Sequence, residues 1–114
     1  MPEFEEPMQD GSSGFSITLK HDPDGVQVRI VGELDLATVP ELNRVLETLD
    51  GDGYSRLMLD LDGVQFIDSS GLSVIASANR SADSNGHRLT IRCSSWQVRR
   101  LFELTGMLEY LTFE

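Results

Sequence analysis

Apolar and polar side chains alternate in four stretches of this chain, which is the pattern of β-strands with one buried face. The stretches cover residues 15–19, 26–30, 56–61 and 88–92. Residues 22–25, Asp-Pro-Asp-Gly, lie between the first two stretches and predict a β-hairpin. After the third stretch, Asp62 and Gly63 predict a turn ahead of a short apolar piece at 64–67. Residues 109–113 are expected to add a short edge strand.

Three other stretches repeat apolar residues at the spacing of an α-helix. The first runs to about residue 50, and Thr38 followed by Glu41 predicts a capping box at its start. The second covers residues 70–83, with Ser69 and Ser70 placed to cap its N-terminus. The third follows another serine cap and ends at Gly106. The apolar positions are Leu42, Val45, Leu46 and Leu49, then Leu72, Ile75, Ala76 and Ala82, then Val98, Leu101 and Phe102.

Strands that alternate with helices favour an α/β domain with right-handed crossovers. A sheet covered on both faces would lack the polar residues found at every other strand position, so one face should be solvated. We therefore predict a single domain over residues 15–114, with a mixed four- to five-stranded sheet and helices mainly on one face. The outward set is Ser16, Thr18, Gln27, Arg29, Met58, Asp60, Arg88 and Arg92.

Composition narrows the classes of partner. The 114-residue chain has a formal charge of −10, which would repel phosphodiester backbones and anionic lipid headgroups. Nucleic acid and membrane surfaces are therefore not expected as partners, and a cytoplasmic location is expected because no apolar stretch is long enough to span a bilayer. Residues 1–14 are acidic and poor in apolar side chains, so they predict a flexible tail. The single Cys93 cannot form an internal disulfide and is expected to fill space in the core.

Candidate chemistry concentrates at residues 68–72, Asp-Ser-Ser-Gly-Leu, where a buried strand leads into the second helix. A hydroxyl at a helix start is accessible and faces the positive end of the helix dipole, so a phosphate would be tolerated there. Ser69 is thus a candidate switch, although a plain N-cap is the simpler interpretation. Asp68 or Ser70 could supply the cap instead, and Gly71 could let a partner approach the backbone.

Three segments in order carry a family resemblance: Gly-Glu-Leu-Asp at 32–35, Phe-Ile-Asp-Ser-Ser-Gly-Leu at 66–72, and Arg-Arg-Leu-Phe-Glu-Leu-Thr-Gly-Met at 99–107. Together they resemble the anti-sigma factor antagonists of bacterial partner switching, which are STAS domains, over residues 15–114. The resemblance implies that Ser69 is phosphorylated by the anti-sigma factor, an ATP-dependent serine kinase, and that a PP2C-type phosphatase reverses this. It also implies a partner surface of Asp35, Asp68, Ser69, Ser70, Gly71 and Leu72, with no cofactor of the chain's own. The chain departs from the family pattern at Ser73, where glycine is usual.

Two alternatives stay open beside this hypothesis. A serine hydrolase could draw on His21 or His87, but neither serine follows a glycine at the spacing of a nucleophile elbow, so we expect no enzyme. A STAS scaffold that assembles with copies of itself or with a sensor is also compatible with the sequence. Arg99 and Arg100 beside Trp96 are expected to form surface ion pairs with Glu103 or other acidic residues rather than a nucleic-acid patch.

Overall fold

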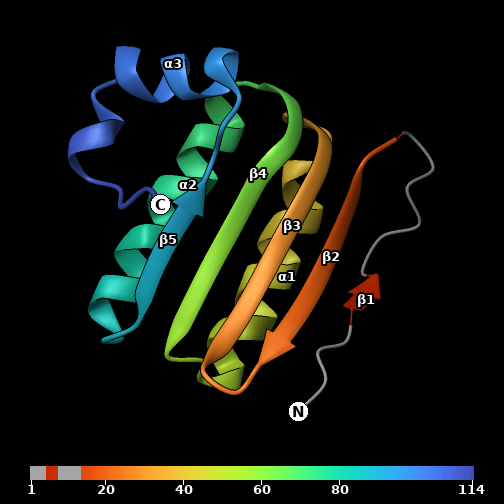
Figure 1. Ribbon diagram of the computed structural model, residues 1–114, viewed down its shortest axis with the longest axis vertical. Coiled ribbons are helices and arrows are strands. Elements are labelled where there is room, and N and C mark those ends of the chain that lie inside the picture. Colours follow the sequence, from red (N-terminus) through yellow and green to blue (C-terminus); the bar gives the residue numbers. More distant parts are fainter. Residues whose placement is uncertain (1–4, 8–13) are drawn as a thin grey trace.

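A computed structural model describes residues 5–7 and 14–114 of the protein (Figure 1). Strands and helices alternate after an initial hairpin, as the hydrophobic pattern predicted. The elements are β1 (Glu5–Pro7), β2 (Ser16–Asp22), β3 (Gly25–Leu34), α1 (Val39–Asp52), β4 (Arg56–Ile67), α2 (Ser69–Ser84), β5 (Arg88–Arg92), α3 (Trp96–Leu104) and the 3-10 helix η1 (Met107–Glu109).

The sheet is mixed, and its spatial order, β1-β2-β3-β4-β5, repeats the order in the sequence. The pairs β1–β2 and β2–β3 are antiparallel, whereas β3–β4 and β4–β5 are parallel. Each parallel pair is joined by one helix, α1 or α2, and both helices lie on the same side of the sheet (Figure 1). The short α3 lies beyond the carboxyl end of β5, on the side of the molecule away from β2 (Figure 1). The predicted α/β class with a one-sided helical layer is therefore confirmed.

The core lies between the sheet and the two long helices. Its largest fully buried side chains are Phe102, Ile17, Ile30, Leu34, Leu42, Leu59, Leu61, Ile67, Ile75 and Ile91. On the opposite face, most of the predicted outward residues keep at least partial exposure. Asp60 is the exception, because Gln27 and Arg92 from the flanking strands lie over its carboxylate, at 3.3 and 3.9 Å. The backbone N–H of Asp62 also donates to Asp60, at 3.0 Å.

The turn predicted at Asp62 and Gly63 is wrong, because β4 continues through both residues to Ile67. Its pairing with β3 shifts twice, between Arg29 and Val31 and again after Gly32, so β4 carries extra residues as bulges. A Cβ on Gly63 would lie 2.8 Å from Val31 Cγ2, which is too close. Glycine at this position thus serves the close approach of two strands rather than a reversal of the chain.

The capping box predicted for α1 is also wrong. Thr38 is the N-cap residue, but its side chain makes no capping bond to the helix. Its hydroxyl instead donates to the Glu33 carbonyl at 2.8 Å and accepts from the Asp35 N–H at 3.0 Å. The hydroxyl is therefore occupied in the loop before the helix. At α3 the serine cap is confirmed, since the Ser95 hydroxyl accepts from the Val98 N–H.

The arginines of α3 do not form the predicted ion pairs with Glu103. The Arg99 guanidinium lies 4.8 Å from the centre of the Phe113 ring, and Arg100 lies 5.8 Å from the centre of the Trp96 ring. Both contacts fall within the range of cation–π interactions. Within residues 14–114, no carboxylate pairs with either arginine.

At the chain ends, the edge strand predicted for 109–113 is reduced to one parallel bridge between Phe113 and Ile91, because η1 occupies the start of that segment. In the predicted tail, residues 1–4 and 8–13 lie outside the described residues. Residues 5–7 depart from a plain tail, since they pair with β2 as β1. In the part of the chain described, no helix is long and apolar enough to cross a membrane.

Candidate functional site

The candidate switch lies where the parallel strands β3 and β4 end together. Leu34 and Ile67 are paired at this edge, and the Asp68 N–H donates to the Leu34 carbonyl at 3.2 Å. The loop at 35–38 and the N-terminus of α2 are therefore brought to the same end of the sheet. Carboxyl ends of parallel strands are a common location for binding sites in α/β proteins.

Asp68, rather than a serine, caps α2. Its extended backbone precedes the helix, and Oδ1 accepts from the Gly71 N–H at 3.1 Å. The second oxygen, Oδ2, accepts from the Leu36 N–H at 3.3 Å. The carboxylate therefore caps the helix and also ties the β3–α1 loop to it. The prediction that the serines cap this helix is wrong, and the alternative of a cap by Asp68 is confirmed.

Ser69 is the first residue of α2, and its side chain is exposed. Within the described residues its hydroxyl makes no hydrogen bond, whereas Ser70, the next residue, is half-buried. The N–H groups of a helix's first turn have no carbonyl partner within the helix, and they carry the positive end of its dipole. An oxyanion attached to Ser69 would therefore lie beside favourable partial charges.

Gly71 and Leu72 face the interior. A Cβ on Gly71 would lie 2.7 Å from Ile67 Cγ1 and 2.9 Å from the Leu34 carbonyl oxygen, so the glycine lets α2 pack closely on the sheet. The space it leaves faces the core rather than an approaching partner. Leu72 is 8% exposed and belongs to the core. Both residues hold the start of α2 in place, and their membership of a partner surface stays a prediction.

Asp35 is a half-buried turn residue. Its Oδ1 accepts from the N–H groups of Ala37 and Thr38, at 3.0 and 3.2 Å. This local turn presents Leu36, whose side chain is 75% exposed, beside the residue that caps α2. Asp35 therefore shapes the loop whether or not a partner contacts its carboxylate.

Sequence reasoning missed two residues of this surface, Leu36 and Phe66. Phe66 is 48% exposed although it sits in an apolar run that predicted a buried strand. The bulges in β4 break the strict alternation and turn it outward. Leu36 lies between a turn acid and a helix start, outside any periodic stretch, and that position was the available signal. Two large apolar side chains thus flank the end of the sheet that carries Ser69.

The charged side chains in the segments around Ser69 are all acidic. Residues 30–43 and 57–79, which supply the loop, the end of β4 and most of α2, contain no lysine or arginine. The Asp68 carboxylate caps α2, and the Asp35 carboxylate lies in the β3–α1 loop that Asp68 ties to this helix. A negative charge gained at Ser69 would therefore have backbone dipoles for support but no cationic side chain from these segments.

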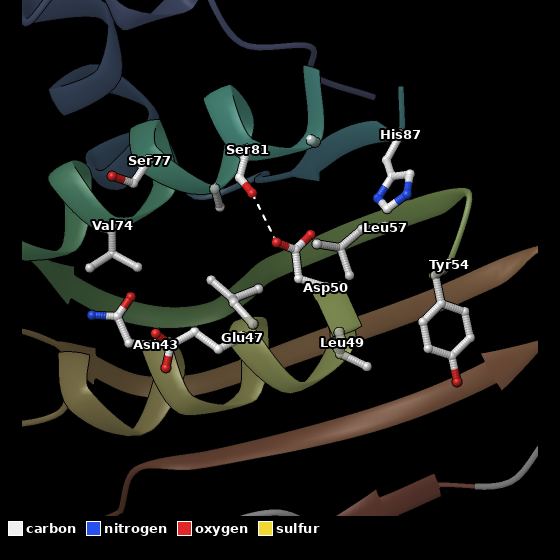
Figure 2. Close-up of a pocket in the computed structure, with 13 residues that line it drawn as sticks. Asn43, Glu47, Leu49, Asp50, Tyr54, Leu57, Val74, Ser77, Ser81 and His87 are labelled. Atoms are coloured by element: carbon white, nitrogen blue, oxygen red, sulfur yellow. Dashed lines mark hydrogen bonds between the residues drawn. The ribbon is translucent and has the colours of Figure 1, made fainter. Parts of the chain in front are cut away.

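A separate pocket of about 180 Å³ lies between α1 and α2 (Figure 2). Leucines and valine form much of its wall, and at its rim the Ser81 hydroxyl donates to Asp50 Oδ2 at 3.0 Å (Figure 2). None of the residues predicted for the switch lines this pocket.

The histidines required by the hydrolase alternative are not assembled with the serines. His87 lines the pocket between the helices, and His21 Nδ1 lies 2.7 Å from the Tyr54 hydroxyl. Within residues 14–114, neither Ser69 nor Ser70 shares a hydrogen bond with a histidine. Over the same residues, no group of three His, Cys, Asp or Glu side chains is placed to hold a metal ion.

The STAS domain profile matches residues 16–114, which is nearly all of the described chain. The chain belongs to the STAS domain family, among its anti-sigma factor antagonists. Curated relatives place it in this group: the anti-sigma-B factor antagonist of Staphylococcus aureus is 35% identical over 85 residues, covering 75% of this chain and 79% of the relative. Proteins of this group are regulatory binding proteins.

Solved structures show the same fold. An anti-sigma factor antagonist from Mycobacterium paratuberculosis aligns with a TM-score of 0.80 at 22% identity, covering 87% of this STAS domain chain and 84% of that one. SpoIIAA in its unphosphorylated form aligns with a TM-score of 0.74 at 22% identity, over 86% and 87% of the two chains. The phosphorylated form of the Bacillus SpoIIAA aligns with a TM-score of 0.68 at 21% identity, over 86% and 90%.

Proposed function

We propose that the unphosphorylated protein binds an anti-sigma factor that is itself a serine kinase, and thereby frees the sigma factor that this kinase holds. Phosphorylation of Ser69 by the same partner ends the binding. The observation that carries the proposal is an exposed, unbonded hydroxyl at a capped helix start, flanked by the exposed Leu36 and Phe66. The chain performs no chemistry of its own, and ATP and magnesium belong to the partner.

The apolar neighbours supply the binding energy in this scheme. Full burial of one leucine or phenylalanine side chain is worth about 1.5–3 kcal/mol. Leu36 is held in position by the bond from its N–H to Asp68, so little loop ordering is required when a partner covers it. The same helix start presents Ser69, so the contact surface and the modified hydroxyl are adjacent.

Phosphorylation would oppose docking by charge and desolvation. A phosphoserine adds about −1.5 to −2 charges at neutral pH, and burying it unpaired at an interface is strongly unfavourable. A loss of about 3 kcal/mol lowers affinity more than a hundredfold, so the domain need not refold to release its partner. The nearby Asp35 and Asp68 add like charge, and no arginine of the flanking segments can neutralise the phosphate.

The scaffold itself is expected to tolerate the modification. An anionic group in the first turn of a helix interacts favourably with the helix dipole. SpoIIAA has been solved in both phosphorylated and unphosphorylated forms, and both resemble this chain in fold. A PP2C-type phosphatase, acting in the cytoplasm, would return the protein to its binding form.

The test is a phosphorylation and binding assay with candidate anti-sigma factor kinases from the source organism. Each kinase is mixed with the protein and magnesium ATP, the modified residue is located by mass spectrometry, and affinity is measured before and after modification. We expect stoichiometric phosphate on Ser69 and at least a hundredfold weaker binding afterwards. Ser69→Ala should bind continuously without being modified, and Ser70→Ala is the matched control for the modification, which should still take up phosphate on Ser69.

Two results would overturn the proposal. Phosphate on Ser70 alone would move the switch, and equal affinity of the modified and unmodified forms would remove it. Self-assembly that is indifferent to Ser69→Asp, without any kinase binding, would favour the STAS scaffold instead.

A further inference from the structure

Each of the three parallel strands has a large, exposed apolar side chain at or just after its carboxyl end. Leu36 follows β3, Phe66 lies at the end of β4, and Trp96 begins the helix that follows β5. Their exposed fractions are 75%, 48% and 68%. Because β3, β4 and β5 run parallel as neighbours, their carboxyl ends point toward one end of the sheet. β5 stops opposite Asp60 whereas β4 continues to Ile67, and residues 93–95 then lead to α3, which lies beyond this end on the β5 side (Figure 1).

The position of Trp96 is fixed to β4. The loop before α3 is held by Asp62, whose Oδ1 accepts from both the N–H and the hydroxyl of Ser94, each at 2.8 Å. Ser95 then caps the helix that Trp96 begins. The indole is therefore presented from an ordered helix start, anchored to the same strand that leads to Ser69.

The chemistry at Trp96 differs from that around Ser69. The Arg100 guanidinium lies 5.8 Å from the centre of the indole ring, one helical turn away. In residues 14–114 no carboxylate pairs with Arg100, although the chain carries 19 acidic residues. Tryptophan and arginine are the side chains most enriched among the residues that dominate interface energies. An exposed pair of this kind complements a partner surface that is apolar with carboxylates at its border.

We propose that Trp96 and Arg100 form a second anchor for the anti-sigma factor kinase, in line with Leu36 and Phe66 along the carboxyl edge of the sheet. This rests on the proposed function, since the anchor serves the same partner. The kinase would cover the switch with one part of its surface and place an acidic, apolar border on α3 with another. Covering Trp96 adds affinity that does not depend on the state of Ser69.

The chain's single tryptophan makes the test direct. The kinase that modifies Ser69 in the assay above is titrated into the protein, using a tryptophan-free kinase variant or selective labelling of the indole. We expect the Trp96 emission to shift to shorter wavelength as the ring is covered. Trp96→Ala should weaken binding by about 30-fold or more, as for an interface anchor. Arg100→Glu should also weaken binding of the kinase, and the loss of affinity should be larger at low salt than at high salt.

Tyr110 provides the matched control, because it is an aromatic residue 75% exposed but located after η1 rather than on α3. Tyr110→Ala should keep affinity within about twofold of the wild type, since isolated exposed side chains contribute little. Circular dichroism and urea unfolding confirm that each variant is folded.

The outcomes separate the two proposals. Tight, Ser69-dependent binding with unchanged Trp96 emission, or with full affinity in Trp96→Ala, overturns the second anchor and leaves the switch standing. Loss of affinity in Tyr110→Ala equal to that in Trp96→Ala also overturns the anchor, because the effect would not be local. Absence of any binding that depends on Ser69 overturns the proposed function, and the anchor with it.

Discussion

Asp68 is expected to stabilise the domain through one oxygen and to order the β3–α1 loop through the other. Replacing it by alanine removes the bond to the Gly71 N–H, which as a helix cap is worth about 1 kcal/mol. It also removes a negative charge from the helix start, worth about 0.3–1 kcal/mol. The bond to the exposed Leu36 N–H adds little to stability, because water can replace it. We therefore expect Asp68→Ala to lower the free energy of unfolding by about 1.5–2 kcal/mol.

Urea unfolding measures this loss. With a denaturant slope of about 1–3 kcal/mol per molar, the midpoint should fall by about 0.5–2 M. Asp68→Asn is the matched variant, because asparagine caps helices as well as aspartate does but lacks the charge and cannot accept at Nδ2. It should lose only about 0.5 kcal/mol. Amide hydrogen exchange at Leu36 should nevertheless rise in both variants.

Two results would refute this reasoning. If Asp68→Ala unfolds at the wild-type midpoint, the capping bond contributes nothing. If the Leu36 amide exchanges at the wild-type rate in both variants, the carboxylate does not order the loop.

Four further predictions concern stability and charge. Gly71→Ala should destabilise the domain by about 1–3 kcal/mol in urea unfolding, because the new Cβ meets a backbone oxygen that cannot move aside. Gly51→Ala, in α1 with open space around it, should stabilise the domain by about 0.5–1 kcal/mol. Ser69→Asp should unfold at or slightly above the wild-type midpoint, since an acid suits the first turn of a helix. The pKa of Asp62 is lowered from 3.8 by hydrogen bonds from the Ser94 hydroxyl and N–H, and an NMR titration should show it rise in Ser94→Ala.

The pH dependence that follows from Asp62 has a definite sign. A carboxyl whose folded pKa is depressed contributes stability that is fully present above its unfolded pKa. That stability is lost as the pH falls through the lower folded value, so the window lies below pH 3.8. If the wild type became more stable on acidification in this window, relative to Asp62→Asn, the assignment would be contradicted.

The glycine predictions have their own contrary outcomes. A destabilised Gly51→Ala, or a Gly71→Ala with unchanged stability, would contradict the packing described at α1 and α2.

Hydrophobic periodicity predicted the strands and helices because one face of each element meets the core. Alternation in β2 and β3 and the helical repeats in α1 and α2 correspond to residues that are buried in the structure. The one-sided helical layer followed from the same observation, since polar residues could not occupy a covered face. The strands, the helices and the one-sided layer could be predicted because each depends on which residues are buried, and the spacing of apolar residues indicates burial.

The predictions that were wrong concern residue types that suit more than one structural role. Asp62 and Gly63 have turn composition, but the glycine is needed for the approach of β3, which only tertiary pairing determines. Thr38 has capping chemistry, yet its hydroxyl is drawn into the loop before the helix. At the candidate site, the sequence placed an accessible Ser69 at a helix start but did not predict the exposed Leu36, because exposure of an apolar residue outside a periodic stretch is set by the loop's shape.

The strands lie in the sheet in the same order as in the sequence, and this order has a consequence for folding during synthesis. Each strand after β1 pairs with the strand that precedes it in the sequence. A strand can therefore pair as soon as it is synthesised, because its neighbour in the sheet has already been made. Loop closure between successive strands spans at most one helix, and short closures favour rapid folding. Assembly on the ribosome can thus proceed strand by strand from one edge, with α3 and the Phe113 bridge closing last over β5.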